Sequence, residues 1–86
     1  MSVSSETAVV LPAHLHARPA GQVVQAAARF QAEVEIEYGG KVANARGVLA
    51  VMALGATAGT TVTLRATGPD AAEAVDAVAA VLTEAR

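Results

Sequence analysis

Residues 15–21, Leu-His-Ala-Arg-Pro-Ala-Gly, mark the point where an extended segment gives way to a helix. Before them, Pro12 closes a short apolar stretch, and beyond Pro19 apolar side chains recur at helical spacing. His16 is therefore expected at or just before a helix N-terminus. Pro19 falls in the first turn of that helix, where its missing N–H group costs no helical hydrogen bond.

A histidine at the start of a helix lies beside backbone N–H groups that have no intrahelical acceptor. The positive end of the helix dipole is at the same place, so the site favours an anion. A neutral His16 imidazole can attack a phosphorus atom, and the dianion then held on its nitrogen would meet the free amides. Arg18 adds a planar, permanently charged group for phosphate oxygens. The competing interpretation of these residues is a His16 that only caps the helix or lies on the surface.

The rest of the chain alternates short strands with helices. Residues 32–38 alternate between apolar and acidic side chains, which predicts a strand with one buried face and one solvated face of glutamates. Gly39 and Gly40 supply the positive φ angles of a tight hairpin. Asp70, with Glu73 three residues later, matches a capping pattern for a final helix. The predicted strands are residues 7–11, 32–38, 41–45 and 59–67, and the predicted helices are residues 17–29, residues 47–55 and the segment after Asp70.

This order, βαββαβα, predicts an α+β open-faced sandwich, in which three helices cover one face of a four-stranded, mainly antiparallel sheet. The order of the strands in the sheet does not follow from the sequence. The chain has 86 residues, which suit a single domain, 1–86, with one modest core. Hydrophobic residues make up 53% of the chain and aromatic residues only 2%, so alanine and valine must form much of that core.

Composition also limits the partners and the compartment. No apolar run is as long as a membrane span, and the first residues lack the basic flank and apolar block of a signal peptide. The absence of cysteine suits the cytoplasm. A net charge of −2 and two aromatic side chains argue against a nucleic-acid partner.

Residues 47–55 are apolar nearly all round, and their leucine, methionine and alanine content favours a short helix that ends at Gly55. A helix this short cannot bury every side chain. Some of Val48, Leu49 and Met52 are therefore expected to form an exposed patch. Ordinary packing in the core is the alternative for these three residues.

The stretch LHARPAG resembles the active-site signature of HPr, the histidine-containing phosphocarrier of the bacterial sugar phosphotransferase system. Two more blocks carry the resemblance, namely Gly40-Lys41 through Asn44-Ala45-Arg46, and residues 48–55 followed by Gly59-Thr60. The resemblance runs from about Thr7 to the C-terminus. It implies the HPr-like fold, which has the same element order.

The resemblance also implies roles for particular residues. In the family, the histidine that matches His16 accepts a phosphoryl group from enzyme I, which phosphoenolpyruvate has charged, and passes it to sugar-specific IIA components. The arginine that matches Arg18 assists, and the short apolar helix docks the partners, which makes Val48, Leu49 and Met52 interface residues. Such a protein carries a phosphohistidine intermediate rather than acting as an independent enzyme. It is expected to be a cytoplasmic monomer without cofactor, metal or membrane insertion.

Two positions depart from the family pattern. His14 stands where the family usually has glycine, and histidine reluctantly adopts the backbone angles that glycine allows. The loop around His16 is therefore expected to differ, and His14 is able to contribute charge near the phosphate. Gly47 stands where many members carry a serine that a dedicated kinase phosphorylates, so the regulatory serine is absent.

Three other functions compete with sugar phosphotransfer. His14 and His16 are spaced as two metal ligands on one side of a strand, but the sequence offers no cysteine, no third histidine and no obvious carboxylate nearby. A regulatory or nitrogen-branch phosphocarrier would keep the same pair of His16 and Arg18. A pure docking module would present residues 48–52 and leave His16 unused.

Overall fold

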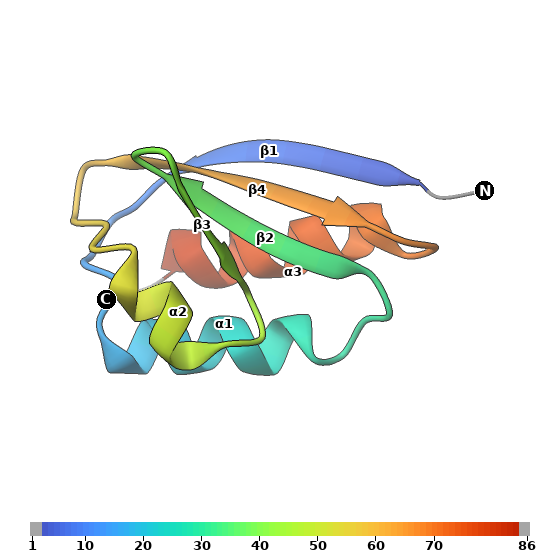
Figure 1. The fold of residues 1–86 in the computed structure, drawn as a ribbon, viewed down its shortest axis with the longest axis horizontal. Helices are drawn as coiled ribbons and strands as arrows, with labels where there is room; N and C mark the ends of the chain where they lie inside the picture. Colours follow the sequence, from blue (N-terminus) through green and yellow to red (C-terminus); the bar gives the residue numbers. More distant parts are fainter. Residues whose placement is uncertain (1–2, 85–86) are drawn as a thin grey trace.

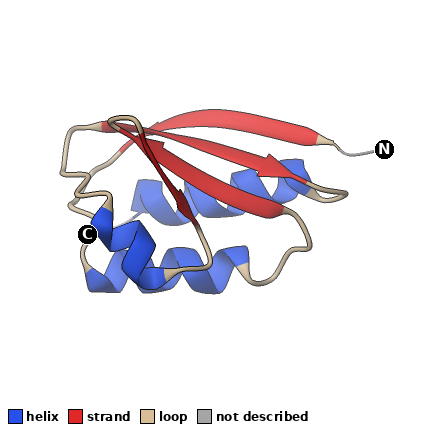
Figure 2. Ribbon diagram, in the orientation of Figure 1, coloured by secondary structure: helices blue, strands red, loops and turns tan. Residues whose placement is uncertain are grey.

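The computed structural model describes residues 3–84. Its elements are β1 (Ser4–Val10), α1 (Ala17–Ala27), β2 (Glu33–Tyr38), β3 (Lys41–Asn44), α2 (Val48–Ala53), β4 (Thr61–Thr67) and α3 (Ala71–Glu84). The strands form one antiparallel sheet in the order β1-β4-β2-β3. All three helices lie on the same side of the sheet (Figure 1; Figure 2). The predicted α+β open-faced sandwich is confirmed.

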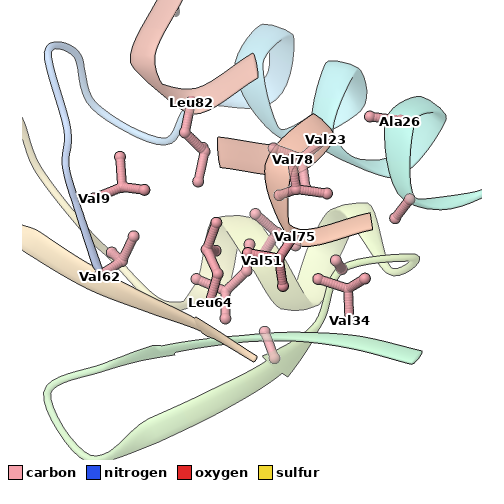
Figure 3. Packing of buried hydrophobic residues seen from close by; sticks show 14 of the residues in the cluster. Val9, Val23, Ala26, Val34, Val51, Val62, Leu64, Val75, Val78 and Leu82 are labelled. Atoms are coloured by element: carbon pink, nitrogen blue, oxygen red, sulfur yellow. The ribbon is translucent and has the colours of Figure 1, made fainter. Parts of the chain in front are cut away.

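The core lies between the inner face of the sheet and the helices (Figure 3). The strands contribute alternate side chains, because successive residues of a strand point to opposite faces. The helices contribute one stripe each, and Ala71, Ala74, Val75, Val78 and Leu82 form the buried stripe of α3, as the spacing predicts. Small side chains bury little area each, so a core rich in alanine and valine depends on close packing between the layers.

Some element ends match the sequence prediction, and the others differ from it by up to three residues. β1 begins at Ser4 rather than residue 7, because Ser4 and Ser5 pair with Thr67 and Ala66 of β4. α1 ends at Ala27 rather than residue 29, because its last turn tightens and the Phe30 N–H group donates to the Ala27 carbonyl at 3.2 Å.

The turns follow the glycines that the sequence marks. Gly39 and Gly40 have φ angles of 59° and 82°, which form the tight hairpin between β2 and β3. Gly55 follows the C-cap residue of α2, and its φ angle of 69° turns the chain away from the helix. Among residues 3–84, no helix is long and apolar enough to cross a membrane.

The polar outer face of the sheet contains ion pairs between neighbouring strands. Arg65 Nε lies 2.8 Å from Glu6 Oε1, and an Arg65 terminal nitrogen lies 3.5 Å from Glu37 Oε1. The hydrogen bond that Arg65 donates to Glu6 is the main reason that the pKa of Arg65 is raised, and Glu37 adds to it. The sequence suggests no partner for the glutamates of β2, and for Glu37 that interpretation is wrong.

The end of the molecule away from residues 15–21 is held by side chains that reach across the chain. Asp70 accepts hydrogen bonds from the Gln31 and Ala32 N–H groups at 3.0 and 2.8 Å. Arg46 donates to the Phe30 carbonyl. The Asp70 carbonyl accepts the first bond of α3, from the Ala74 N–H group, but its carboxylate is directed to the α1–β2 loop. The predicted side-chain cap is therefore replaced by a long-range contact.

Candidate functional site

His16 is the N-cap residue of α1. Its backbone is extended, with φ −82° and ψ −174°, and its carbonyl accepts the first helical hydrogen bond, from the Ala20 N–H group at 3.0 Å. Its side chain makes no capping hydrogen bond and is exposed. The imidazole is thus presented to solvent at the positive end of the helix, as the sequence predicts.

The first turn of α1 offers two backbone donors. The N–H groups of Ala17 and Arg18 precede the first intrahelical bond, and Pro19 has no N–H group. No acidic side chain lies in this turn to neutralise the helix end. The start of α1 is therefore able to receive an anion that is attached to His16.

Arg18 is the second residue of α1, although a residue before proline is biased away from helical angles. Its side chain is exposed and makes no hydrogen bond or ion pair within residues 3–84. The guanidinium is free to approach a phosphoryl group on the neighbouring His16. His16 and Arg18, which the sequence predicts as partners, thus share one helix end.

A second segment holds the loop that carries His16 (the left end of Figure 1). The Leu15 N–H group donates to the Ala56 carbonyl at 3.1 Å, and the Ala58 N–H group donates to His14 Nδ1 at 2.9 Å. Leu15 between the two histidines is buried. Residues 56–58 therefore hold residues 14–16 in place through their backbone atoms.

The two histidines lie side by side. Their ring centroids are 5.3 Å apart and the ring planes are tilted by 32°. The His16 N–H group donates to the His14 carbonyl at 2.9 Å, which closes a tight backbone turn between them. No non-glycine residue among residues 3–84 has a positive φ angle, so His14 adopts its backbone conformation without left-handed strain. The expected difference in this loop is a side-chain anchor rather than a strained backbone.

The apolar patch of α2 is graded rather than uniform. Leu49 is 81% exposed and Met52 is 36% exposed, whereas Val48 is half-buried against the core. Val51 on the opposite side of the helix is fully buried and fixes its orientation. α2 packs against α1 and leads directly into residues 55–60, the segment that holds His14.

Comparison with protein-family models matches residues 3–84 to the family described as the PTS HPr component phosphorylation site. The chain belongs to the HPr family of phosphocarriers.

Solved structures of HPr-family proteins share the fold and much of the sequence. The phosphocarrier protein HPr from Bacillus anthracis is 40% identical, with a TM-score of 0.81 over 94% of this chain and 96% of that chain. The histidine-containing phosphocarrier protein of Mycoplasma is 27% identical, with a TM-score of 0.83 over 94% of this chain and 100% of that chain. Crh, the catabolite repression protein of Bacillus subtilis, is 43% identical, with a TM-score of 0.78 over 88% of this chain and 87% of that chain. Because Crh forms a domain-swapped dimer, the monomeric state expected for this HPr-family chain stays a prediction.

Gly47, which the resemblance predicts at the position of the HPr regulatory serine, is the N-cap residue of α2. Its φ angle is −109°, and its carbonyl accepts from the Val51 N–H group at 3.0 Å. A Cβ atom at this position would meet the Ala50 Cβ at 3.5 Å and the Asn44 carbonyl at 3.6 Å, which are ordinary contacts. The backbone of this HPr-family protein therefore accepts a serine without rearrangement.

Sequence reasoning missed the role of Ala56 and Ala58, which hold residues 14–16 in place. Both act through backbone atoms, so their side chains carry no signal of the role. The nearest sequence signal is Gly59, whose φ angle of 85° makes the tight turn that returns the chain to β4. Within residues 3–84, no group of three or more potential metal ligands comes together.

Proposed function

We propose that this protein receives a phosphoryl group on His16 from enzyme I and passes it to sugar-specific IIA components, in the cytoplasm. The observation that carries the proposal is the exposed His16 imidazole at the start of α1, whose first turn offers two backbone donors and the exposed Arg18. His16 is the phosphoryl acceptor in this proposal, and Arg18 stabilises the phosphate.

The transfer requires little covalent work from the protein. A neutral His16 nitrogen gives its lone pair to phosphorus, a P–N bond forms, and the bond from phosphorus to the donor atom of enzyme I breaks. The electron pair of that bond stays with the donor. Transfer to a IIA component repeats the step in the opposite sense, with His16 as the leaving group. The free amides of Ala17 and Arg18 and the Arg18 side chain offset charge on the phosphoryl oxygens.

Partners dock on α2 in this proposal. Leu49 and Met52 provide exposed apolar area, and the neighbouring Val48 extends it toward the core. A carrier has to release each partner, so a small interface suits its task better than an extensive one.

The test is phosphorylation with enzyme I and phosphoenolpyruvate, followed by intact mass measurement under alkaline conditions. We expect one added phosphate that is labile in acid and stable in base. With phosphoenolpyruvate in excess, His16→Ala should remove it, whereas His14→Ala is the matched control and should keep most of it. Full phosphorylation of the His16→Ala protein would falsify the assignment.

A regulatory phosphocarrier is a second candidate, favoured by the 43% identity to Crh, a catabolite repression protein. A nitrogen-branch carrier would use the same His16 chemistry. Mixing the phosphorylated protein with sugar-specific IIA components distinguishes the candidates, because only the uptake carrier should lose its phosphate to them. A protein that takes no phosphate from enzyme I would instead be a docking module.

A further inference from the structure

His14 has a fixed proton position that the proposed transfer does not use. Its Nδ1 atom accepts a hydrogen bond from the Ala58 N–H group at 2.9 Å. A ring nitrogen that accepts a hydrogen bond carries no proton, so the proton of a neutral His14 is on Nε2. The His14 side chain is exposed, and its Nε2–H group has no acceptor within residues 3–84.

The ring that carries this donor is a neighbour of the His16 imidazole. The ring centroids of His14 and His16 are 5.3 Å apart, and a tilt of 32° leaves the two rings side by side. The hydrogen bond from the His16 N–H group to the His14 carbonyl holds the two residues in a tight turn. A phosphoryl group on His16 would extend beyond its ring, and at this separation its oxygens can approach the neighbouring His14 imidazole.

The chain segments next to His14 contain few charged groups. The sequence places no acidic or basic side chain in residues 55–60, in α2 or in residues 11–13. The first turn of α1 adds only the cation Arg18. Within these segments the other titratable and charged groups are His16 and Arg18, so a phosphoryl dianion would be the strongest acceptor that they meet.

We propose that His14 is a second phosphate-binding imidazole, which donates its Nε2–H to the phosphoryl group carried on His16. The inference rests on the proposed function, because it needs a phosphorylated His16. The hydrogen bond from Ala58 occupies Nδ1, which leaves Nε2–H as the donor.

This contact stabilises the phosphorylated carrier relative to the free one. One net hydrogen bond shifts an equilibrium constant by roughly 3- to 10-fold. Removing the imidazole should lower the share of phosphoryl groups that the protein retains by that factor. Glutamine offers an amide oxygen in place of Nδ1 and an amide nitrogen in place of Nε2–H, without titrating near neutral pH. His14→Gln should therefore restore most of the effect.

The experiment is a competition for a limited supply of phosphate. Equal amounts of wild type and one variant, distinguishable by mass, are equilibrated with catalytic enzyme I and limiting phosphoenolpyruvate. Intact mass under alkaline conditions then gives the ratio of the two phosphorylated forms. The variants are His14→Ala, His14→Gly and His14→Gln. The matched control is Thr60→Val, which removes the hydrogen bond from the Thr60 hydroxyl to the Thr57 carbonyl in the same segment of the chain.

We expect wild type to hold about 3- to 10-fold more phosphate than His14→Ala or His14→Gly, and an equal share beside His14→Gln or Thr60→Val. Equal shares for wild type and His14→Ala would overturn the inference. A His14→Gln protein as weak as His14→Ala would also overturn it. A wild type that takes no phosphate overturns the proposed function as well, so the two failures are distinct.

Discussion

The Arg18 guanidinium is exposed at the second position of α1, and within residues 3–84 it makes no hydrogen bond or ion pair. Its removal therefore takes little from the free energy of unfolding. Its value lies in the planar pair of donors that it can turn toward phosphoryl oxygens. A lysine keeps the charge but loses that planar geometry.

Arg18→Lys should slow phosphoryl transfer to and from the carrier by about three- to tenfold, the range of one good charge-assisted hydrogen bond. Its melting temperature should stay within about 2 °C of wild type, as for other exposed substitutions. Single-turnover transfer rates and a thermal scan measure the two effects. Arg29→Lys, two residues beyond the end of α1, is the control, and unchanged transfer rates in Arg18→Lys would contradict the role.

The residue scale also shows which part of the site a sequence can reveal. His16 and Arg18 are predictable because a proline and a helical pattern place them at a helix start. The anchoring of His14 is not predictable, since its partner is the backbone of an alanine 44 residues away. Backbone donors look alike in every sequence, and only the fold selects one of them.

At the scale of elements, α2 combines a buried side with an apolar exposed side. Val51 is fully buried, whereas Leu49 is 81% exposed. A charge on the exposed side therefore has little effect on the core. The same charge in a docking surface has to be desolvated when a partner binds, which weakens the complex.

Leu49→Glu and Met52→Glu should each slow transfer from enzyme I by about tenfold or more, through weaker binding. Their circular dichroism spectra should stay native-like. Ala72→Glu, an exposed position on α3, introduces the same charge elsewhere and should transfer normally. Rates that respond equally to all three substitutions would show that net charge rather than the α2 surface matters.

Val48 differs from Leu49 and Met52 because it belongs both to the core and to the predicted docking surface. It is half-buried against the core, so Val48→Glu should lower the melting temperature as well as the transfer rate. A Met52→Glu protein that unfolds in the same way would assign Met52 to the core instead of the interface. Thermal scans of the two variants beside wild type make this comparison directly.

The residue at position 47 decides whether the start of α2 carries a hydroxyl group that a kinase could phosphorylate. An HPr kinase with ATP should leave the wild-type protein unmodified at the start of α2, since glycine has no hydroxyl. Gly47→Ser should gain a phosphate, because its Cβ meets only ordinary contacts and a phosphoserine suits the positive end of a helix. Gly47→Ala is the control, and peptide mapping locates the modification. Kinase-dependent phosphate on wild-type Thr57, the nearest hydroxyl in sequence after the helix, would contradict the prediction.

The existence of each element was predictable, and its ends were less so. The alternation in β2 and β4 and the stripe of α3 set their type without help from the rest of the chain. β1 was predicted too short, because Ser4 and Ser5 are weak strand formers that extend only by pairing with β4. The strand order depends on such pairings between distant segments, which no local pattern contains.

At the scale of the whole molecule, Asp70 joins α3 to the loop between α1 and β2. Its carboxylate accepts from the Gln31 and Ala32 N–H groups. The bond from Gln31 is the main reason that the pKa of Asp70 is lowered, and Arg46 contributes. A lowered pKa in the folded state means that the ionised group stabilises the fold.

Asp70→Asn should therefore lower the melting temperature at pH 7, because the amide cannot accept both bonds as a carboxylate does. The stabilisation is fully present above the ordinary aspartate pKa of about 4 and is lost as the pH falls through the lowered pKa of the folded state. The difference between the two proteins should close in that acidic range. Asp76→Asn, an exposed position on the same helix, should show no such pH-dependent difference.

The contact between residues 14–16 and residues 56–58 also affects how a newly made chain becomes active. His14 and Ala58 are 44 residues apart, and β1 pairs with β4 across most of the sequence. Closing such a span costs chain entropy, which is offset only when distant segments meet, and non-local closure is the slow part of folding. A chain with only α1 or the β2–β3 hairpin formed would contain His16 without its neighbours. We therefore expect newly made protein to gain its phosphoryl-accepting competence in one late, cooperative step.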